Sequence, residues 1–281
     1  MSNKLILEPQ GGLANRMRVI ASGLWLGRIT GNLVTVVWTL NKGLNSPFEK
    51  LFEPIENCII TSRRLPFYFF RSEYKKPPIK KVLIRLINTL FAYNYIIIED
   101  PGVILLQERR LDFSDFRENL KTPYFRTCEE FGDNTLEFNN FIPVPEIQQR
   151  IDLQCSRFTP KTIGLHIRRT DHEIAIRNSP VELFINRIKN DLEKDPDINY
   201  FLSTDDAETE SQIRSLFGDK IMTIDKEYTR NSIKGIKDAV IDLFCLSRTS
   251  KIYGSYWSSF SDIASKIGKT KIEKIIINKN A

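Results

Sequence analysis

The sequence lacks the motifs that define several common functional classes. It has neither G-x-G-x-x-G nor G-x-x-x-x-G-K-[ST], the two standard nucleotide fingerprints. It has no RNP-type, zinc-finger or helix-turn-helix pattern, and its basic residues are scattered over both halves, so we expect no nucleic-acid partner. Its cysteines form no C-x-x-C pair and have no histidine nearby, which predicts reduced thiols and no zinc site. They are Cys58, Cys128, Cys155 and Cys245.

Long hydrophobic runs are also missing. The first seven residues have no long apolar core and no small-residue cleavage site, so they predict an initial strand and a cytoplasmic protein. The longest apolar stretch, 82–98, is interrupted by one arginine and two asparagines and is shorter than the roughly 20 residues of a spanning helix. The basic, amphipathic segment 74–91 predicts a core helix with solvated lysines; the alternative is a weak peripheral contact with the inner membrane face.

The composition that is present is that of a folded enzyme-sized protein. With 281 residues, 41% hydrophobic and 27% charged, the chain is long enough for two domains with separate cores. The formal net charge of +6 and a pI of about 9.0 favour anionic partners such as nucleotide phosphates.

Hydrophobic periodicity predicts alternating strands and helices. The chain opens with the pattern β-loop-α-β. The expected strands are residues 5–7 and the β-branched run 33–38, and the expected amphipathic helix between them includes Met17 and Trp25. Residues 41–140 are less regular. Two prolines near residue 143 suggest a boundary, so we expect domains at 1–143 and 144–281. Beyond it, repeated βαβ units predict a parallel sheet, whose strand ends collect ligands. The expected strands are 162–167, 200–204, 220–224 and 251–253.

Two adjacent arginines follow the first of these strands. Arg168 and Arg169 could neutralise a diphosphate through bidentate hydrogen bonds, which a single lysine cannot reproduce. The alternative is a surface ion pair with Asp171 or Glu173.

Two aspartates follow the second strand. A carboxylate at Asp205 or Asp206 could accept both N–H groups on the Watson–Crick edge of guanine, or bind ribose hydroxyls. The alternative is that one of them caps the next helix.

Two further turns could approach an anion through the main chain. Ser258, after the last strand, begins a helix whose free N–H groups could bind phosphate, although simple N-capping explains the same serine. Near the N-terminus, Gly11 and Gly12 form a turn between strand and helix that lets backbone N–H groups approach a ligand.

Together these segments resemble the superfamily of α-1,2-, α-1,6- and protein O-fucosyltransferases, with the α-1,6 and nodulation branch most similar. Segment 166–171 resembles its H-[VI]-R-R-x-D motif, segment 201–206 its [YF]-L-[AS]-T-D-D motif, and Ser258–Phe260 its serine-rich third motif. Residues 230–246 resemble the helix before that motif. The opening Gly-Gly-Leu-x-Asn is shared with the α-1,2 branch. The resemblance covers about residues 5–25 and 160–268.

This resemblance implies an α/β fold of GT-B type, with two Rossmann-like lobes, parallel sheets and an inter-lobe cleft. It implies an inverting transfer of fucose from GDP-fucose to a glycan hydroxyl, with the donor in the C-terminal lobe, the acceptor in the N-terminal lobe and no metal ion. No D-x-D is placed to hold a cation. Arg168 is the position that the family pattern makes essential. The other expected donor contacts are Gly11, Gly12, Asn15, His166, Thr204, Asp205, Asp206, Ser258, Ser259 and Phe260.

An inverting transfer also needs a base within about 3 Å of the acceptor hydroxyl. Glu173 is the expected base and Asp171 the alternative, because the family's glutamate falls where this chain has Ile174, Ala175 and Ile176. His166 is expected to contact the donor or to brace its strand. Two other functions stay open: a non-catalytic relative that binds GDP or a glycan, and a transferase that uses another GDP-sugar such as GDP-mannose. The sequence does not identify the acceptor.

Overall fold

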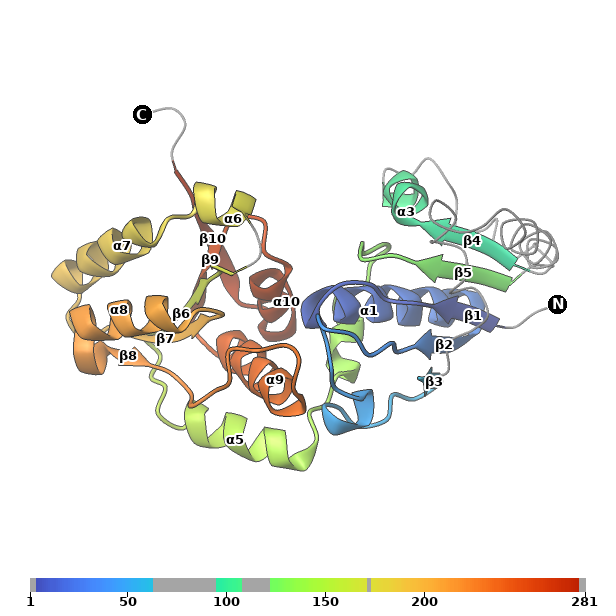
Figure 1. Cartoon of the computed structure of the whole chain (residues 1–281), viewed down its shortest axis with the longest axis horizontal. Helices are drawn as coiled ribbons and strands as arrows, with labels where there is room; N and C mark the ends of the chain where they lie inside the picture. The colour runs from blue at the N-terminus through green and yellow to red at the C-terminus, as the bar shows by residue number, and fades with distance from the viewer. Residues whose placement is uncertain (1–3, 63–94, 108–121, 171–172, 278–281) are drawn as a thin grey trace, which may run out of the picture. The chain divides into compact units, whose positions relative to one another are not determined.

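The computed structural model describes residues 4–62, 95–107, 122–170 and 173–277, and it contains two compact units. Unit 1 comprises Met1–Asn41, Pro47–Glu49 and Glu53–Phe141, and unit 2 comprises Lys42–Ser46, Lys50–Phe52 and Ile142–Ala281 (Figure 1). The amphipathic segment 74–91 and Asp171 lie outside the described residues. Among those that are described, no helix combines the length and apolarity needed to cross a bilayer.

Unit 1 is built on a five-stranded sheet in the order β3-β2-β1-β5-β4, and every pairing is parallel. Its strands are β1 (Lys4–Leu7), β2 (Leu33–Val37), β3 (Cys58–Thr61), β4 (Tyr95–Glu99) and β5 (Thr122–Arg126). Its helical segments are α1 (Leu13–Thr30), α3 (Asp100–Gln107) and the 3₁₀ turns η1 (Phe48–Lys50), which continues into unit 2, and η3 (Thr135–Asn140).

Helix α1 packs closely on β1. A Cβ atom at Gly23 would lie 2.1 Å from Leu7 Cδ1, so any larger residue there would have to displace the buried Leu7 side chain. The helix ends at Gly31, which has a φ of 72° and donates its N–H to the Gly27 carbonyl, as a left-handed C-terminal residue commonly does.

Unit 2 contains a second parallel five-stranded sheet, in the order β10-β9-β6-β7-β8. Because the chain adds strands on one side of β6 and then returns to its other side, β6 lies at the topological switch point. The strands are β6 (Thr162–Ile167), β7 (Asn199–Thr204), β8 (Ile221–Met222), β9 (Lys251–Ser255) and β10 (Lys271–Ile275). The helical segments are α5 (Pro145–Cys155), α6 (Glu173–Asn178), α7 (Val181–Lys194), α8 (Ala207–Phe217), η4 (Gly218–Lys220), α9 (Ile233–Ser247) and α10 (Ser259–Gly268).

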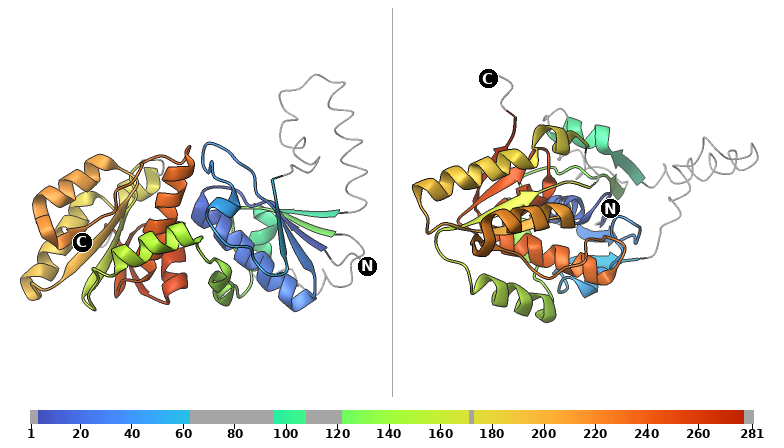
Figure 2. Two further views of the ribbon diagram at one scale, coloured as in Figure 1. Left: turned by 90° about the horizontal axis from the view of Figure 1, so that it is seen from below. Right: turned by 60° about the vertical axis from the view of Figure 1, so that its left-hand side comes forward.

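Helices cover both faces of this second sheet (Figures 1 and 2). On one face, Phe184 and Ile188 of α7 and Ile213 of α8 pack with the strands in one hydrophobic cluster. On the other face α9 contacts β6 and β7, and α5 and α10 pack beside it. The expected α/β fold with two parallel sheets is confirmed.

Candidate functional site

The ends of three neighbouring strands bring the sequence motifs of unit 2 to one edge of its sheet. Strand β6 pairs with β7 through Ile167 and Thr204, and with β9 through His166 and Gly254. The residues that follow these strands therefore emerge side by side, at the switch point where open α/β sheets bind ligands.

Arg168 leaves β6 from a backbone position fixed by Ser255. The Arg168 N–H donates to Ser255 Oγ at 3.0 Å, and that hydroxyl donates to the His166 carbonyl at 3.3 Å. Ser255 is fully buried, so it clamps the end of β6 to the end of β9. The clamp sets the starting point of the Arg168 side chain.

Asp205 joins three segments of the site. Its Oδ1 accepts the Arg169 N–H at 2.7 Å, and its Oδ2 accepts the Thr170 hydroxyl, also at 2.7 Å. The Arg230 guanidinium, from the loop before α9, lies 3.5 Å from Oδ2. This carboxylate therefore holds the turn after β6 against the end of β7.

The Arg169 side chain makes a hydrogen bond within the protein. Its guanidinium donates to the Ser179 carbonyl, in the short turn between α6 and α7. Burial lowers the pKa of Arg169, and nearby carboxylates including Glu182 oppose that shift. Part of its hydrogen-bonding capacity is thus used inside the protein.

The structure decides which of the two aspartates caps α8. Asp206 is the N-cap residue, and its carboxylate accepts from both the N–H, at 2.9 Å, and the hydroxyl of Thr209. The buried Thr204 hydroxyl accepts the Asp206 N–H at 3.3 Å. Asp205 is the carboxylate that faces the other strand ends.

His166 is buried in β6 and stacks on Phe260. The two rings lie 5.0 Å apart with an interplanar angle of 21°. Burial, followed by the charge of Arg168, lowers the pKa of His166 well below its usual range, so the ring is neutral at pH 7. No described residue bonds to its buried Nδ1.

The N-terminus of α10 adds backbone donors to this edge. Ser258 is its N-cap residue and Ser259 its first residue; the buried Ser258 hydroxyl has no hydrogen-bond partner among the described residues. Lys274 approaches the Ser258 carbonyl at 3.5 Å and pairs with Asp262. Just before the helix, Trp257 has a left-handed backbone, with a φ of 49°, and is 65% exposed.

A buried ion pair lies behind the strand ends. Lys226 Nζ is 2.8 Å from Asp242 Oδ2 and 3.7 Å from Glu210, and the Ser203 hydroxyl donates to Asp242 at 3.1 Å. Burial raises the pKa of Asp242 even though Lys226 lowers it. Sequence position did not indicate Lys226 or Asp242, because Lys226 lies several residues beyond the short strand β8 and Asp242 lies within α9.

Glu173, the expected base, is the first residue of α6. Its side chain is 86% exposed and lies 3.6 Å from Arg177, one helical turn away. The carboxylate is therefore open to solvent and forms an ion pair with Arg177 on its own helix.

The glycine turn of unit 1 is shaped by a buried arginine. Gly11 has a φ of 82°, and a Cβ atom there would lie 2.7 Å from Asn15 Nδ2. Arg16 is fully buried: its Nε donates to the Gly11 carbonyl at 3.0 Å, and its guanidinium lies 5.0 Å from the Trp38 ring centre. Gly12 is the N-cap residue of α1.

A second charged group lies at the strand ends of unit 1. Glu8, 4% exposed, accepts from the Tyr124 hydroxyl and lies 3.2 Å from Arg126 Nε. No sequence pattern indicates this group, because Glu8 follows β1 and its partners lie in β5, more than 110 residues further along the chain.

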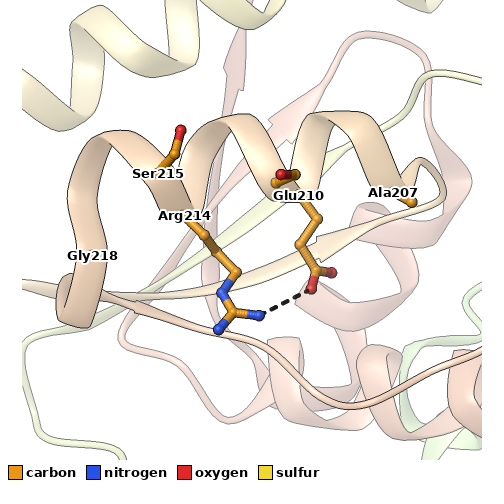
Figure 3. Close-up of a pocket in the computed structure, with 6 residues that line it drawn as sticks. Ala207, Glu210, Arg214, Ser215 and Gly218 are labelled. Carbon is orange, nitrogen blue, oxygen red and sulfur yellow. Dashed lines mark ion pairs between the residues drawn. The ribbon is translucent and has the colours of Figure 1, made fainter.

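Two further observations bear on metals and pockets. Within the described ranges, no group of three or more histidine, cysteine or acidic side chains could hold a metal ion. A surface pocket of about 480 Å³ runs along the outer side of α8 and is lined by Glu210, Arg214 and their neighbours (Figure 3). It contains none of the residues expected at the site, so we assign it no role.

No protein-family model and no curated protein sequence matches the chain.

Solved structures are similar along most of the chain. A NodZ α-1,6-fucosyltransferase soaked with GDP-fucose has a TM-score of 0.62 and 20% identity, over 94% of this chain and 92% of its own. A mutant of Arabidopsis thaliana FUT1 in complex with GDP has a TM-score of 0.61 and 12% identity, over 99% and 71%. POFUT1 in complex with GDP-fucose has a TM-score of 0.58 and 10% identity, over 98% and 99%. The chain therefore has the fold of these fucosyltransferases.

Proposed function

We propose that the chain is an inverting glycosyltransferase that moves fucose from GDP-fucose to a hydroxyl of a glycan acceptor without a metal ion. The observation that carries the proposal is the meeting of Arg168, Asp205 and the N-terminus of α10 at one sheet edge. The shared fold supports it, because a NodZ crystal was soaked with GDP-fucose and POFUT1 was solved in complex with GDP-fucose.

Arg168 is the main catalytic residue in this proposal. As the bond between fucosyl C1 and the β-phosphate oxygen breaks, negative charge grows on the diphosphate and C1 becomes oxocarbenium-like. A guanidinium held at the end of β6 stabilises that charge, and the N-terminal amides of α10 add to it. Arg169 contributes by its backbone contact with Asp205 and by bracing the start of α7.

The acceptor oxygen attacks C1 from the face opposite the leaving diphosphate, and its proton passes to a base. We assign this role to Glu173, whose exposed carboxylate is accessible to a bound acceptor. Asp171 is the alternative. The family's glutamate falls where this chain has Ile174, Ala175 and Ile176. The assignment of the base to Glu173 therefore depends on whether Glu173→Gln loses activity.

Donor and acceptor are assigned to different parts of the chain. We propose that residues 144–281 bind the donor, because Arg168, Asp205 and Ser258 all lie in unit 2. Residues 1–143 are proposed to bind most of the acceptor, with Gly11, Gly12 and Asn15 presenting main-chain and amide groups to the ligands.

A nucleotide panel tests the donor assignment. Calorimetry with EDTA present should show binding of GDP, GDP-fucose and GDP-mannose and much weaker binding of UDP and ADP. If no guanine nucleotide binds, or if all diphosphates bind equally, the proposal is wrong.

Arg168→Ala tests catalysis. We expect the rate of fucosyl transfer, or of GDP-fucose hydrolysis, to fall by about 10²–10³. Arg157→Ala, which removes an exposed arginine of unit 2, is the control and should keep full activity. Binding of GDP-fucose with no turnover by the unaltered protein would instead identify a non-catalytic relative, and turnover of GDP-mannose a different transferase.

A further inference from the structure

Two of the four cysteines lie side by side in unit 2, on the packed helices α5 and α9. Cys155 is the last residue of α5 and Cys245 lies near the end of α9, and their Sγ atoms are 3.7 Å apart. Both are free thiols. A disulfide bond is about 2 Å long, so the two sulfur atoms must approach by only ~1.7 Å more to be joined. Small changes in the side-chain torsions can provide this movement.

The two thiols differ in their exposure to solvent. Cys245 is fully buried, whereas Cys155 is half-buried and is followed by the exposed residues Ser156 and Arg157. A small reagent in solution can therefore reach the Cys155 sulfur, while Cys245 is shielded from it by the packing of α9.

The surroundings of Cys155 favour its thiolate. A deprotonated Cys155 accepts a hydrogen bond from the Cys245 thiol, and this contact is the largest cause that lowers the pKa of Cys155. The Arg248 guanidinium also bonds to the Cys155 sulfur and lowers this pKa further, while partial burial opposes the shift. Arg248 is held in place by Asp152 at 2.6 Å. Because the thiolate is the nucleophile in thiol exchange, Cys155 is the more reactive member of the pair.

The two cysteines of unit 1 have the opposite character. Cys128 is also half-buried, but burial and the charges of Asp100 and Glu129 raise the pKa of its thiol. Burial raises the pKa of Cys58 to about 12. Both therefore stay protonated near neutral pH and serve as internal references for the reactivity of Cys155.

The pair lies away from the strand ends that carry the candidate site. Cys155 comes shortly before the first residue of β6, and Cys245 comes shortly before the first residue of β9. Because the strands of this sheet are parallel, the pair lies toward the edge opposite the ends of β6 and β9. Its chemistry is therefore independent of the proposed function.

We propose that Cys155 and Cys245 form a reactive dithiol, a modification site that small-molecule disulfides oxidise to an internal disulfide between α5 and α9. The Cys155 thiolate attacks one sulfur of the reagent, forms a mixed disulfide and releases the first thiolate. Cys245 then gives its proton to solvent, and its sulfur attacks Cys155 Sγ and displaces the second thiolate. The two cysteines lose two electrons and two protons, and the reagent disulfide is reduced to two thiols.

The test is oxidation of the full chain by oxidised glutathione, followed by alkylation of the remaining thiols and mass analysis of the intact protein and its peptides. We expect two of the four thiols to be lost and the protein to become lighter by two hydrogen atoms, with no glutathione retained. One cross-linked pair of peptides should contain Cys155 and Cys245. Dithiothreitol should restore all four thiols.

Three variants separate the two steps. Cys245→Ala removes the second thiol and should trap glutathione on Cys155 as a stable mixed disulfide; Cys245→Ser keeps a side chain of similar size if the alanine variant folds poorly. Cys155→Ser should leave the shielded Cys245 unmodified. Cys128→Ser, which removes a half-buried thiol of unit 1, is the matched control and should form the same cross-link as the unaltered protein.

Three results would overturn the proposal. The first is retention of all four thiols at a glutathione concentration that modifies the chain unfolded in urea. The second is an adduct or cross-link confined to Cys58 or Cys128. The third is a glutathione adduct on Cys155 that persists while Cys245 is present, because the second thiol would then not reach the first. Each result leaves the proposed function intact, since that function is tested by GDP binding to the reduced protein.

Discussion

At the scale of single residues, His166 shows how burial changes the chemistry of a side chain. Its ring is buried and stacked on Phe260 of α10, and burial is the largest cause of its lowered pKa. At a pH of about 6.5, where an exposed histidine would be half protonated, His166 therefore stays neutral. A neutral, stacked ring suits the bracing role that the sequence analysis gave as one of its two alternatives.

The lowered pKa of His166 makes the stability of the fold depend on pH in a predictable direction. Below pH 6.5 the unfolded chain protonates this histidine and the folded chain does not, so the unfolded state binds more protons and stability falls as the pH falls. One such group contributes at most about 1.4 kcal/mol per pH unit. His166→Phe, which keeps an aromatic ring against Phe260, should reduce this acid sensitivity in urea unfolding at pH 7.5 and 5.5.

The only other histidine in the sequence supplies the control. His172→Gln should keep the acid sensitivity of the unaltered protein. An identical loss of stability on acidification in the unaltered protein and in His166→Phe would show that the histidine is not the cause.

At the scale of structural elements, the start of α9 determines where the Arg230 loop lies. A Cβ atom at Gly235 would be 2.0 Å from the Thr229 carbonyl oxygen, so the first turn of the helix and the loop are in direct backbone contact. Any side chain at Gly235 must push Thr229, and with it the next residue, away from the helix.

Gly235→Ala should therefore affect both stability and ligand binding. We expect a loss of about 1–3 kcal/mol in the free energy of unfolding, as for other overpacked sites, and a several-fold rise in the Kd of GDP. Gly27→Ala creates milder crowding in unit 1, where its Cβ would lie 2.6 Å from Val34 Cγ2 and 2.9 Å from the Asn32 carbonyl oxygen. It should cost some stability and leave the Kd of GDP unchanged; a rise in the Kd of GDP in both variants would mean that the effect is not local.

Some elements could be predicted from the sequence and others could not. The inner strands β6, β7 and β9 are buried almost along their whole length and carry apolar residues in their middle, because both of their faces are covered, and all three were predicted from the sequence. Strand β10 was missed, because at the sheet edge three of its five residues are lysine or glutamate. The expected strand 220–224 is only the two residues Ile221–Met222.

The same reasoning applies to the site. Position after a strand was enough to identify Arg168 and the two aspartates, because parallel strands end at a common edge. It could not decide which aspartate caps α8, since that depends on a contact with Thr209. Arg230 reaches the edge from a loop, and only tertiary packing brings it there.

At the scale of the whole molecule, neither of the two units is one continuous stretch of the chain. Two short segments that follow β2 in sequence, Lys42–Ser46 and Lys50–Phe52, belong to unit 2. Their contacts explain why: Asn45 donates to the Arg230 carbonyl, and Val144 donates to the Leu51 carbonyl, each at 3.1 Å. A division at a single point in the sequence cannot represent this arrangement.

Binding of GDP should therefore protect defined parts of unit 2. At about 100 times its Kd, GDP should add about 2.7 kcal/mol to the free energy of unfolding. Hydrogen exchange should slow most at residues 168–170, 205–206, 229–232 and 255–260. Additional protection at 11–15 would support the expected contact of the glycine turn with the donor; uniform protection of both units, or none at 168–170, would contradict the assignment.

The exposed Trp257 has a practical consequence. Of the three tryptophans, Trp38 is buried and Trp257 is 65% exposed at the strand ends that are proposed to bind the donor. Its indole emission is therefore sensitive to the polarity of the surrounding solvent and to collisional quenchers. Occupancy of this edge can be followed by intrinsic fluorescence in the unlabelled protein, and Trp257→Phe supplies the blank.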